Sequence, residues 1–166
     1  GWDRASCSRY EVMEEAFSLF SEMEVLGKDW PAFVSGMKAA LYGKGRQAYE
    51  TRRRAFLESE IGKRLPVLKE QLMVYFVFTY FCGAVYDDHI LGKMQTAVVS
   101  TILIQELAQA VWQEKQEGFT FMDFVDVAHR YSREIEHSDI NLLRLEKLFD
   151  KLPLFQPKQL IRILSV

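Results

Sequence analysis

Apolar residues recur at helical spacing along almost the whole chain. Val12, Ala16, Leu19, Phe20 and Met23 stand at positions i, i+4, i+7, i+8 and i+11, which places them on one face of a helix. No segment keeps the strict alternation of apolar and polar residues that is typical of a half-buried strand. The pattern therefore predicts an all-α fold, a bundle of seven or eight helices with short connections that favour antiparallel neighbours.

Residues that begin and end helices divide this pattern into elements. Ser8 with Glu11, and Thr120 with Asp123, fit capping boxes, and Ser138 fits an N-cap. Helices are expected after Ser8 as far as Gly27, after Asp29 as far as Gly43, from the basic segment 44–54 to about 60, from 65 to about 82, from about 90 to 115, after Thr120, after Ser138, and from 158 to 164.

Two of these helices are expected to lie at the centre of the bundle. No charged residue occurs between Glu70 and Asp87, and Glu106 is the only one between Lys93 and Glu114. A helix that is apolar most of the way round is normally buried by its neighbours. The uncharged stretch 71–86 is shorter than the roughly 20 residues of a bilayer span, so a core helix is predicted rather than a membrane helix.

Composition narrows the class of protein. With 166 residues, 49% of them hydrophobic, the chain is expected to form a single domain over residues 1–166 and not to be disordered. Two cysteines exclude a disulfide scaffold and a cysteine-ligated metal centre. A net charge of −2 argues against nucleic acid or a membrane surface as partner. The N-terminal residues do not form a signal peptide, so we expect a cytoplasmic protein. Because the chain begins with Gly rather than Met, we expect it to have been processed or excised from a longer one.

Glu106 is the most unusual residue, because burying a lone carboxylate costs several kcal/mol. One interpretation is a pocket carboxylate that binds a cation or acts as a base. The alternative, which the usual pairing of buried acids favours, is a structural ion pair with Arg130 or Arg133 from a neighbouring helix.

The segment after Thr120 invites a metal hypothesis. Asp126 and His129, and Glu134 and His137, have the acid-x-x-His spacing of di-iron bundles, but such sites need the motif on two different helices. Pairs at i, i+4 between Arg130 and the acids Asp126 and Glu134 explain the charges more simply, so no metal site is predicted. The expected inner stripe of this helix is Phe121, Phe124, Val125, Ala128, Tyr131, Ser132 and Ile135.

Two further clusters have ordinary structural interpretations. The basic residues of segment 44–54 are expected to form a solvated helix face, because no wider basic surface accompanies them. Most aromatic residues of segment 75–86 are expected in the core, with a small polar cavity as an option because tyrosine hydroxyls need partners. These two sets are Lys44, Arg46, Arg52, Arg53 and Arg54, and Tyr75, Phe76, Phe78, Tyr80, Phe81 and Tyr86.

Several stretches, taken in order, resemble a known family. They are Glu24-Val25-Leu26 with Asp29-Trp30-Pro31, the run from Glu70 to Phe78 continuing to Tyr86-Asp87, Ala97-Val98-Val99-Ser100, and the run from Tyr131 to Ser138 with Asn141-Leu142. Together they resemble the C-terminal helical part of the bacterial flagellin lysine-N-methylase family, over nearly the whole chain. The stretch from Tyr131 to Asn141 is the most distinctive of them.

The resemblance implies a parent enzyme that methylates lysines of flagellin, with S-adenosylmethionine as methyl donor and an iron–sulfur cluster in a cysteine-rich N-terminal region. That region is missing here, so no cluster ligand transfers to this chain. A glycine-rich strand–turn–helix for the methyl donor is also missing. The implied partners are flagellin and the missing N-terminal region, and the fragment alone is not expected to be catalytic.

Two main hypotheses follow. In the first, the chain is the C-terminal domain of a lysine N-methylase, with a supporting or substrate-recognition role. In the second, it is a stand-alone helical module that binds a ligand or dimerises, with a pocket near Glu106. No catalytic residue is assigned. The candidate site-lining residues are Glu106, Arg133, Glu136 and His137.

Overall fold

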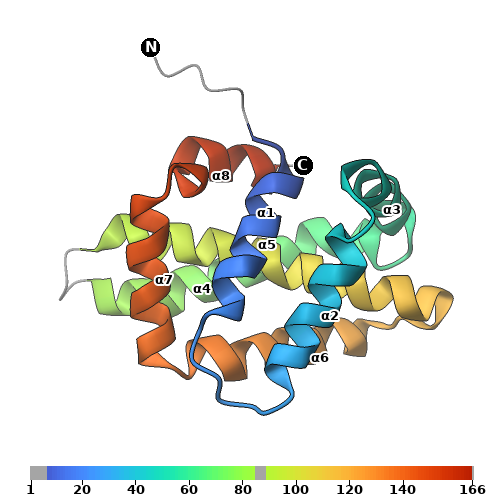
Figure 1. Ribbon diagram of the computed structural model, residues 1–166. Coiled ribbons are helices and arrows are strands. Elements are labelled where there is room, and N and C mark those ends of the chain that lie inside the picture. Colours follow the sequence, from blue (N-terminus) through green and yellow to red (C-terminus); the bar gives the residue numbers. More distant parts are fainter. Residues whose placement is uncertain (1–6, 85–88, 166) are drawn as a thin grey trace.

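Eight α-helices form most of the regular structure in a computed structural model that describes residues 7–84 and 89–165 (Figure 1). The elements are α1 (Arg9–Ser21), α2 (Trp30–Tyr42), α3 (Arg46–Glu58), η1 (Gly62–Arg64), α4 (Leu65–Ala84), α5 (Ile90–Lys115), η2 (Gln116–Gly118), α6 (Phe121–Tyr131), η3 (Ser132–Glu136), α7 (Asp139–Lys151), η4 (Pro153–Phe155) and α8 (Pro157–Leu164). No strand occurs in the described ranges, which confirms the predicted all-α class.

The predicted helix starts carry the expected capping bonds. Ser8 accepts a hydrogen bond from the backbone N–H of Glu11, and the Glu11 carboxylate accepts one from the backbone N–H of Ser8 at 2.6 Å. Thr120 and Asp123 form the same reciprocal pair at the start of α6. These bonds satisfy N–H groups that have no partner inside the helix, so the sequence specifies these starts locally.

Helix α5 is the centre of the molecule (Figure 1). It is 26 residues long, and every residue from Gln95 to Ala110 except Val98 is buried. Helices from both ends of the chain pack around it, including α1, α2, α7 and α8. Apolar residues occur all the way round α5 because neighbouring helices cover it on every side, as the sequence predicted.

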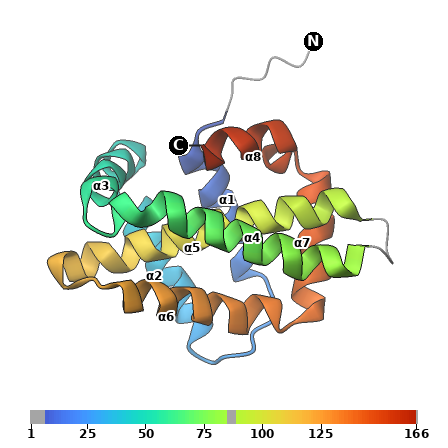
Figure 2. The ribbon, with the colours of Figure 1, turned by 180° about the vertical axis from the view of Figure 1, so that it is seen from behind.

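Helix α4 packs along α5 as predicted, but it is buried on one face only. Leu65, Leu68, Phe76 and Tyr80, which share one face of the helix, are each at most 7% exposed. Figure 2 shows α4 crossing the near side of the molecule with no helix in front of it. The expectation that α4 is enclosed on every side was therefore wrong, because both of its faces are apolar and sequence pattern cannot tell the covered face from the open one.

The segment after α6 departs from the predicted continuous α-helix. Residues Ser132–Glu136 form a π-helical turn, which changes the face on which later residues lie. The predicted inner stripe is correct for Phe124, Tyr131 and Ile135, which are buried, but Phe121 is 40% exposed. Glu134 is buried instead of pairing with Arg130 on the surface.

Candidate functional site

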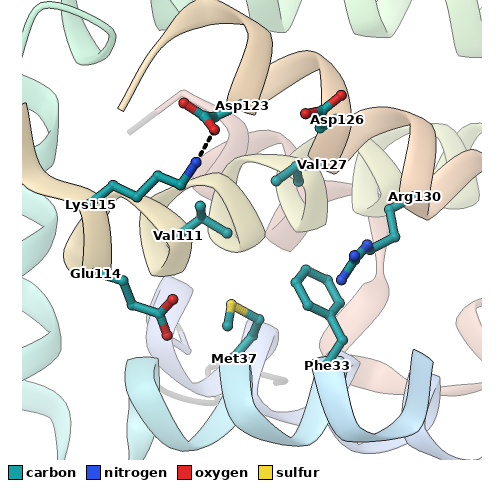
Figure 3. A pocket seen from close by; sticks show the side chains of 9 residues that line it. All are labelled: Phe33, Met37, Val111, Glu114, Lys115, Asp123, Asp126, Val127 and Arg130. Atoms are coloured by element: carbon teal, nitrogen blue, oxygen red, sulfur yellow. Dashed lines mark hydrogen bonds and ion pairs between the residues drawn. The ribbon is translucent and has the colours of Figure 1, made fainter. Parts of the chain in front are cut away.

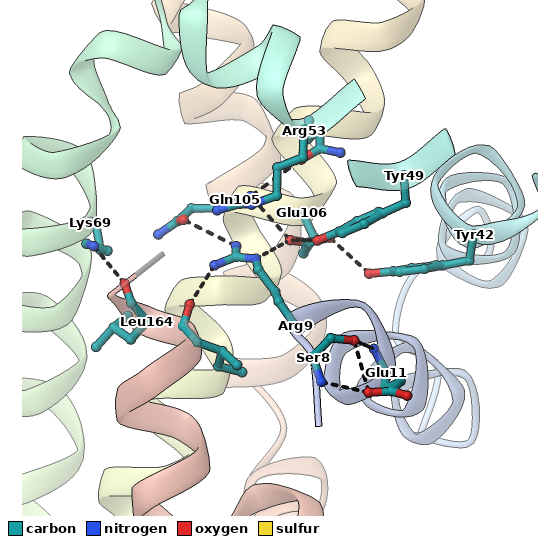
Figure 4. Close-up of polar contacts among 12 residues, drawn as sticks. Ser8, Arg9, Glu11, Tyr42, Tyr49, Arg53, Lys69, Gln105, Glu106 and Leu164 are labelled. Atoms are coloured by element: carbon teal, nitrogen blue, oxygen red, sulfur yellow. Dashed lines mark hydrogen bonds and ion pairs between the residues drawn. The ribbon is translucent and has the colours of Figure 1, made fainter. Parts of the chain in front are cut away.

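Glu106 lies at the centre of a buried polar network that connects four helices (Figure 4). Its Oε1 atom accepts a hydrogen bond from Arg9 Nε at 2.7 Å and from Tyr49 Oη at 2.9 Å, and its Oε2 atom accepts one from Tyr42 Oη at 2.9 Å. Arg53 Nη1 lies 3.6 Å from Oε1. Glu106 is thus a structural ion pair, but its partners come from α1 and α3 rather than being Arg130 or Arg133.

The surroundings keep the two tyrosine hydroxyls of this network protonated. Burial raises the pKa of the Tyr42 hydroxyl well above its usual value, and the Glu106 carboxylate raises it further. The pKa of Tyr49 is raised for the same two reasons. Both phenols therefore stay protonated and act as hydrogen-bond donors to Glu106.

The pocket expected beside Glu106 is occupied by the protein's own side chains. Glu106 is 0% exposed, and both of its carboxylate oxygens accept hydrogen bonds. A cavity of about 320 Å³ is lined by Arg53 and Gln105 but not by Glu106 itself. The arrangement fixes helix positions and leaves no free carboxylate for a ligand.

A separate pocket of about 340 Å³ lies between α2, α5 and α6 (Figure 3). Three of its charged groups interact with protein groups: Lys115 forms an ion pair with Asp123, and the Arg130 guanidinium lies 4.4 Å from the centre of the Phe33 ring. Arg130 also lies 3.7 Å from the carboxylate of Asp29. The pocket contains neither a histidine nor a thiol, and its acidic side chains are Glu114, Asp123 and Asp126.

The stretches that carry the family resemblance bind each other. The Glu134 Oε2 atom accepts hydrogen bonds from the backbone N–H groups of Leu26 and Gly27, at 3.2 and 2.8 Å. The Asn141 side chain accepts from the Glu24 N–H at 2.8 Å and donates to the Glu24 carbonyl at 3.0 Å. A Cβ atom on Gly27 would clash with Glu134, which explains the glycine. The distinctive stretch 131–141 thus holds the loop between α1 and α2.

Three of the four candidate site residues share one turn. Arg133 is exposed and lies 3.6 Å from the Glu134 carboxylate, and His137 is exposed at the end of the π turn. Glu136 is half-buried, and its Oε1 atom is buried without a hydrogen-bond partner. Glu106 belongs to the separate network with Arg9, so the structure does not bring the four together.

The open face of α4 is the most unusual surface of the described chain. We call it the α4 apolar surface, and it consists of Val67, Val74, Tyr75, Val77 and Phe78. These side chains are between 37% and 70% exposed, and Phe78 is the most exposed of them. No charged residue interrupts α4 after Glu70. An exposed, uncharged patch with aromatic residues is typical of a protein interaction site.

Sequence reasoning identified Glu106 but missed its partners and the open face of α4. Arg9 is 97 residues from Glu106, and nothing in its own local sequence distinguishes it from a solvated arginine. Arg53 was expected on a solvated face but is buried. Of the expected core aromatics, Phe76 and Tyr80 are buried, Tyr75 and Phe78 are exposed, and Tyr86 lies outside the described residues.

Within the part of the chain that the structure describes, no group of three or more histidine, cysteine or acidic side chains could hold a metal ion. None of the helices in that part is long and apolar enough to cross a bilayer.

These features define an all-α fold whose buried polar groups join distant helices and whose α4 apolar surface is exposed. Residues 3–163 match the model of the FliB lysine N-methylase C-terminal domain. The chain therefore belongs to the FliB lysine N-methylase C-terminal domain family. No curated protein and no solved structure gives a significant match.

Proposed function

We propose that this chain is a supporting domain of a protein-lysine N-methylase that acts on flagellin in the cytoplasm, and that its α4 apolar surface binds the remainder of the enzyme. The observation that carries the proposal is the uncharged, exposed face of α4, centred on Phe78. A lysine N-methylase with a C-terminal domain must contain a further region, and this region is the occupant that we propose.

The chemistry of the surface favours this occupant over a polar substrate segment. Permanent interfaces resemble a hydrophobic core cut in half, whereas transient ones contain more polar and charged groups. The α4 apolar surface has the first character: its polar neighbours are Glu70, Gln71 and Thr79, and no charge lies on the helix beyond Glu70, where Val74, Tyr75, Val77 and Phe78 are exposed. Aromatic side chains such as Phe78 are the usual energetic centres of such interfaces.

The methyl-transfer chemistry belongs, in this proposal, to the other region. An iron–sulfur cluster is typically held by four cysteine thiolates, and the chain contains two cysteines. Its residues therefore do not fit the cluster that the resemblance implies. The buried network of Glu106 supplies rigidity to the domain rather than a catalytic group.

The test is to mix the chain with the catalytic region of a lysine N-methylase of this family and to measure complex formation by calorimetry. We expect Phe78→Asp to weaken the complex at least tenfold, because it buries a charge in an apolar interface. Ile161→Asp is the matched control, since Ile161 is 63% exposed on α8, and it should leave the complex intact. Loss of flagellin methylation, followed by mass spectrometry, should accompany loss of the complex.

Three outcomes would contradict the proposal. Phe78→Asp could bind as tightly as the unmodified chain, or Ile161→Asp could weaken binding equally. A homodimer that Phe78→Asp abolishes, together with no binding of the catalytic region, would assign the surface to a second copy of this chain instead.

A further inference from the structure

The cavity of about 320 Å³ that Arg53 and Gln105 line has a positively charged wall. We call it the cationic cavity, and α3, η1, α4, α5 and the residue after α8 contribute to it. None of the described residues that line it is acidic, whereas Arg53, Lys63 and Lys69 are cationic. Arg53 is 7% exposed and Lys69 is half-buried, and Lys63 is exposed and pairs with Glu60 at 2.6 Å. The cavity therefore concentrates positive charge in a chain whose net charge is −2.

Gln105 presents a hydrogen-bond donor without a partner in this cavity. Its Oε1 atom accepts a hydrogen bond from Arg9 Nη2 at 3.4 Å, whereas its Nε2 atom is buried and has no partner. Arg9 fixes the orientation of the amide, because a guanidinium can only donate hydrogen bonds. Figure 4 shows the Gln105 side chain between the Arg9 guanidinium and Lys69. Buried polar atoms are nearly always paired, so this N–H group calls for an acceptor.

The nearby carboxylate of Glu106 does not supply that acceptor. Its two oxygens accept hydrogen bonds from Arg9, Tyr42 and Tyr49, and it does not line the cavity. In Figure 4, Glu106 and Lys69 lie on opposite sides of the Arg9 guanidinium. The acceptor that fits the cavity must therefore come from another group.

Lys69 shows what charge this group should carry. Burial lowers the pKa of Lys69, and the guanidinium groups of Arg9 and Arg53 lower it further. The Lys69 ammonium has three N–H groups, and it donates one hydrogen bond to the Leu164 carbonyl at 2.7 Å. Hydrogen bonds from cationic donors to oxyanions are stronger than those between neutral groups. An anion in the cavity would both offset the repulsion between these cations and accept hydrogen bonds.

We propose that the cationic cavity binds one small oxyanion, a carboxylate or a phosphate. Gln105 Nε2 and Lys69 Nζ donate hydrogen bonds to its oxygen atoms, and Arg53 and Lys63 add positive charge. The volume of about 320 Å³ is at the small end of ligand pockets and suits such a group. The oxyanion comes either from a free ion or from a carboxylate of a polypeptide. The site uses other residues than the α4 apolar surface, so its test does not depend on the proposed function.

The experiment titrates the chain at constant ionic strength and follows the side-chain amide signals of Gln105 by NMR. The probes are sodium phosphate, sodium acetate and a peptide with blocked ends and one aspartate. The same peptide with asparagine is the uncharged control. We expect saturable shifts with the anions and none with the asparagine peptide. Tighter binding of the aspartate peptide than of phosphate would identify a polypeptide carboxylate as the source, and phosphate binding at least as tight would identify a free ion.

A second chain controls for the terminal carboxylate, because Ser165 lines the cavity. It carries two glycines after Val166, which move the terminal carboxylate away from Ser165. We expect saturable phosphate binding by this extended chain too. Binding by the extended chain alone would identify the terminal carboxylate as the oxyanion that the cavity holds in the shorter chain.

Variants separate binding from folding, with phosphate affinity measured by calorimetry. Gln105→Glu keeps the size of the side chain but puts a carboxylate in the cavity, and Lys69→Gln removes a cationic donor. Each should weaken phosphate binding roughly tenfold or more. Lys38→Gln is the matched control, since Lys38 is also half-buried and donates a 2.8 Å hydrogen bond to Ser18, on another part of the molecule.

Three results would overturn the proposal. They are no saturable shift with any anion in either chain, the same shift with the asparagine peptide, and unchanged phosphate affinity of both Gln105→Glu and Lys69→Gln. Each variant is first checked for an unchanged helical circular dichroism spectrum.

Discussion

The backbone N–H of Gly27 donates a 2.8 Å hydrogen bond to Oε2 of Glu134, across a separation of 107 residues in the sequence. The same oxygen accepts a second bond from the N–H of Leu26. Glu134 is 1% exposed, so this contact joins the loop between α1 and α2 to the π turn inside the protein. The most distinctive sequence stretch of the family thus has a structural role that is visible at atomic detail.

Removing this contact should destabilise the protein. Glu134→Ala leaves two backbone N–H groups without their charged acceptor, which costs about 2 kcal/mol or more. Urea unfolding measures the change. Arg133→Ala is the neighbouring control at an exposed side chain and should have little effect. Equal stability of the two variants would show that the loop does not depend on Glu134.

The buried ion pair of Glu106 gives a second prediction. Glu106→Gln removes the carboxylate of a buried ion pair with Arg9, and loss of one member of such a pair costs about 3–5 kcal/mol. Glu50→Gln removes one member of the exposed pair with Arg46 and should leave thermal unfolding almost unchanged. A small effect of Glu106→Gln would mean that other groups hold these helices in place.

Two tyrosines of α4 and α6 should respond differently to the loss of a hydroxyl group. Tyr131→Phe leaves Ser100 Oγ without its partner and should cost about 1 kcal/mol. Tyr80→Phe removes a buried hydroxyl that has no partner, so stability should be unchanged or higher. The comparison uses chemical denaturation of both variants in parallel. A larger loss for Tyr80→Phe than for Tyr131→Phe would contradict the observed pairing.

The start of α6 should make stability depend on pH. The ion pair with Lys115 and hydrogen bonds from Thr120 lower the pKa of Asp123 to about 2. Because an unfolded aspartate has a pKa near 3.9, this contribution is present above about pH 4 and disappears as the pH falls toward 2. The melting temperature of Asp123→Ala should therefore differ from that of the unmodified chain at pH 6 but much less at pH 2.5. Asp126→Ala, one turn further along α6, is the control and should not show this dependence.

The comparison of helices α1, α5 and α6 with their predictions shows where sequence reasoning works. The capping residues Ser8 and Thr120 were identified because a cap bond joins residues three positions apart. The span of α5 from Ile90 to Lys115 agrees with its uncharged pattern. Cap bonds and helical periodicity depend on residues that are close in the sequence, so they can be predicted without knowing the fold.

The contacts of the candidate site residues could not be predicted from the sequence. Glu136 was named as a candidate, but its unpartnered oxygen depends on a π turn that no pattern predicted. The partners of Glu106 were assigned to the wrong helix, since many arginines could reach a central carboxylate and only the packing selects Arg9 and Arg53. Contacts between residues about a hundred positions apart cannot be inferred from a single sequence, because neither residue's local pattern identifies its partner.

The sequence by itself determined that the protein is all-α, where most helices begin and end, and that α4 and α5 are the two apolar helices of the bundle. The tertiary structure decided that α5 is enclosed while α4 keeps one apolar face open around Phe78. The physical reason is that hydrophobic burial is not directional: an apolar residue is stabilised against any apolar neighbour, so composition specifies that burial is favourable without specifying which partner provides it. Among the described residues no helix covers that face of α4, and the proposed function assigns the missing partner to the rest of the methylase.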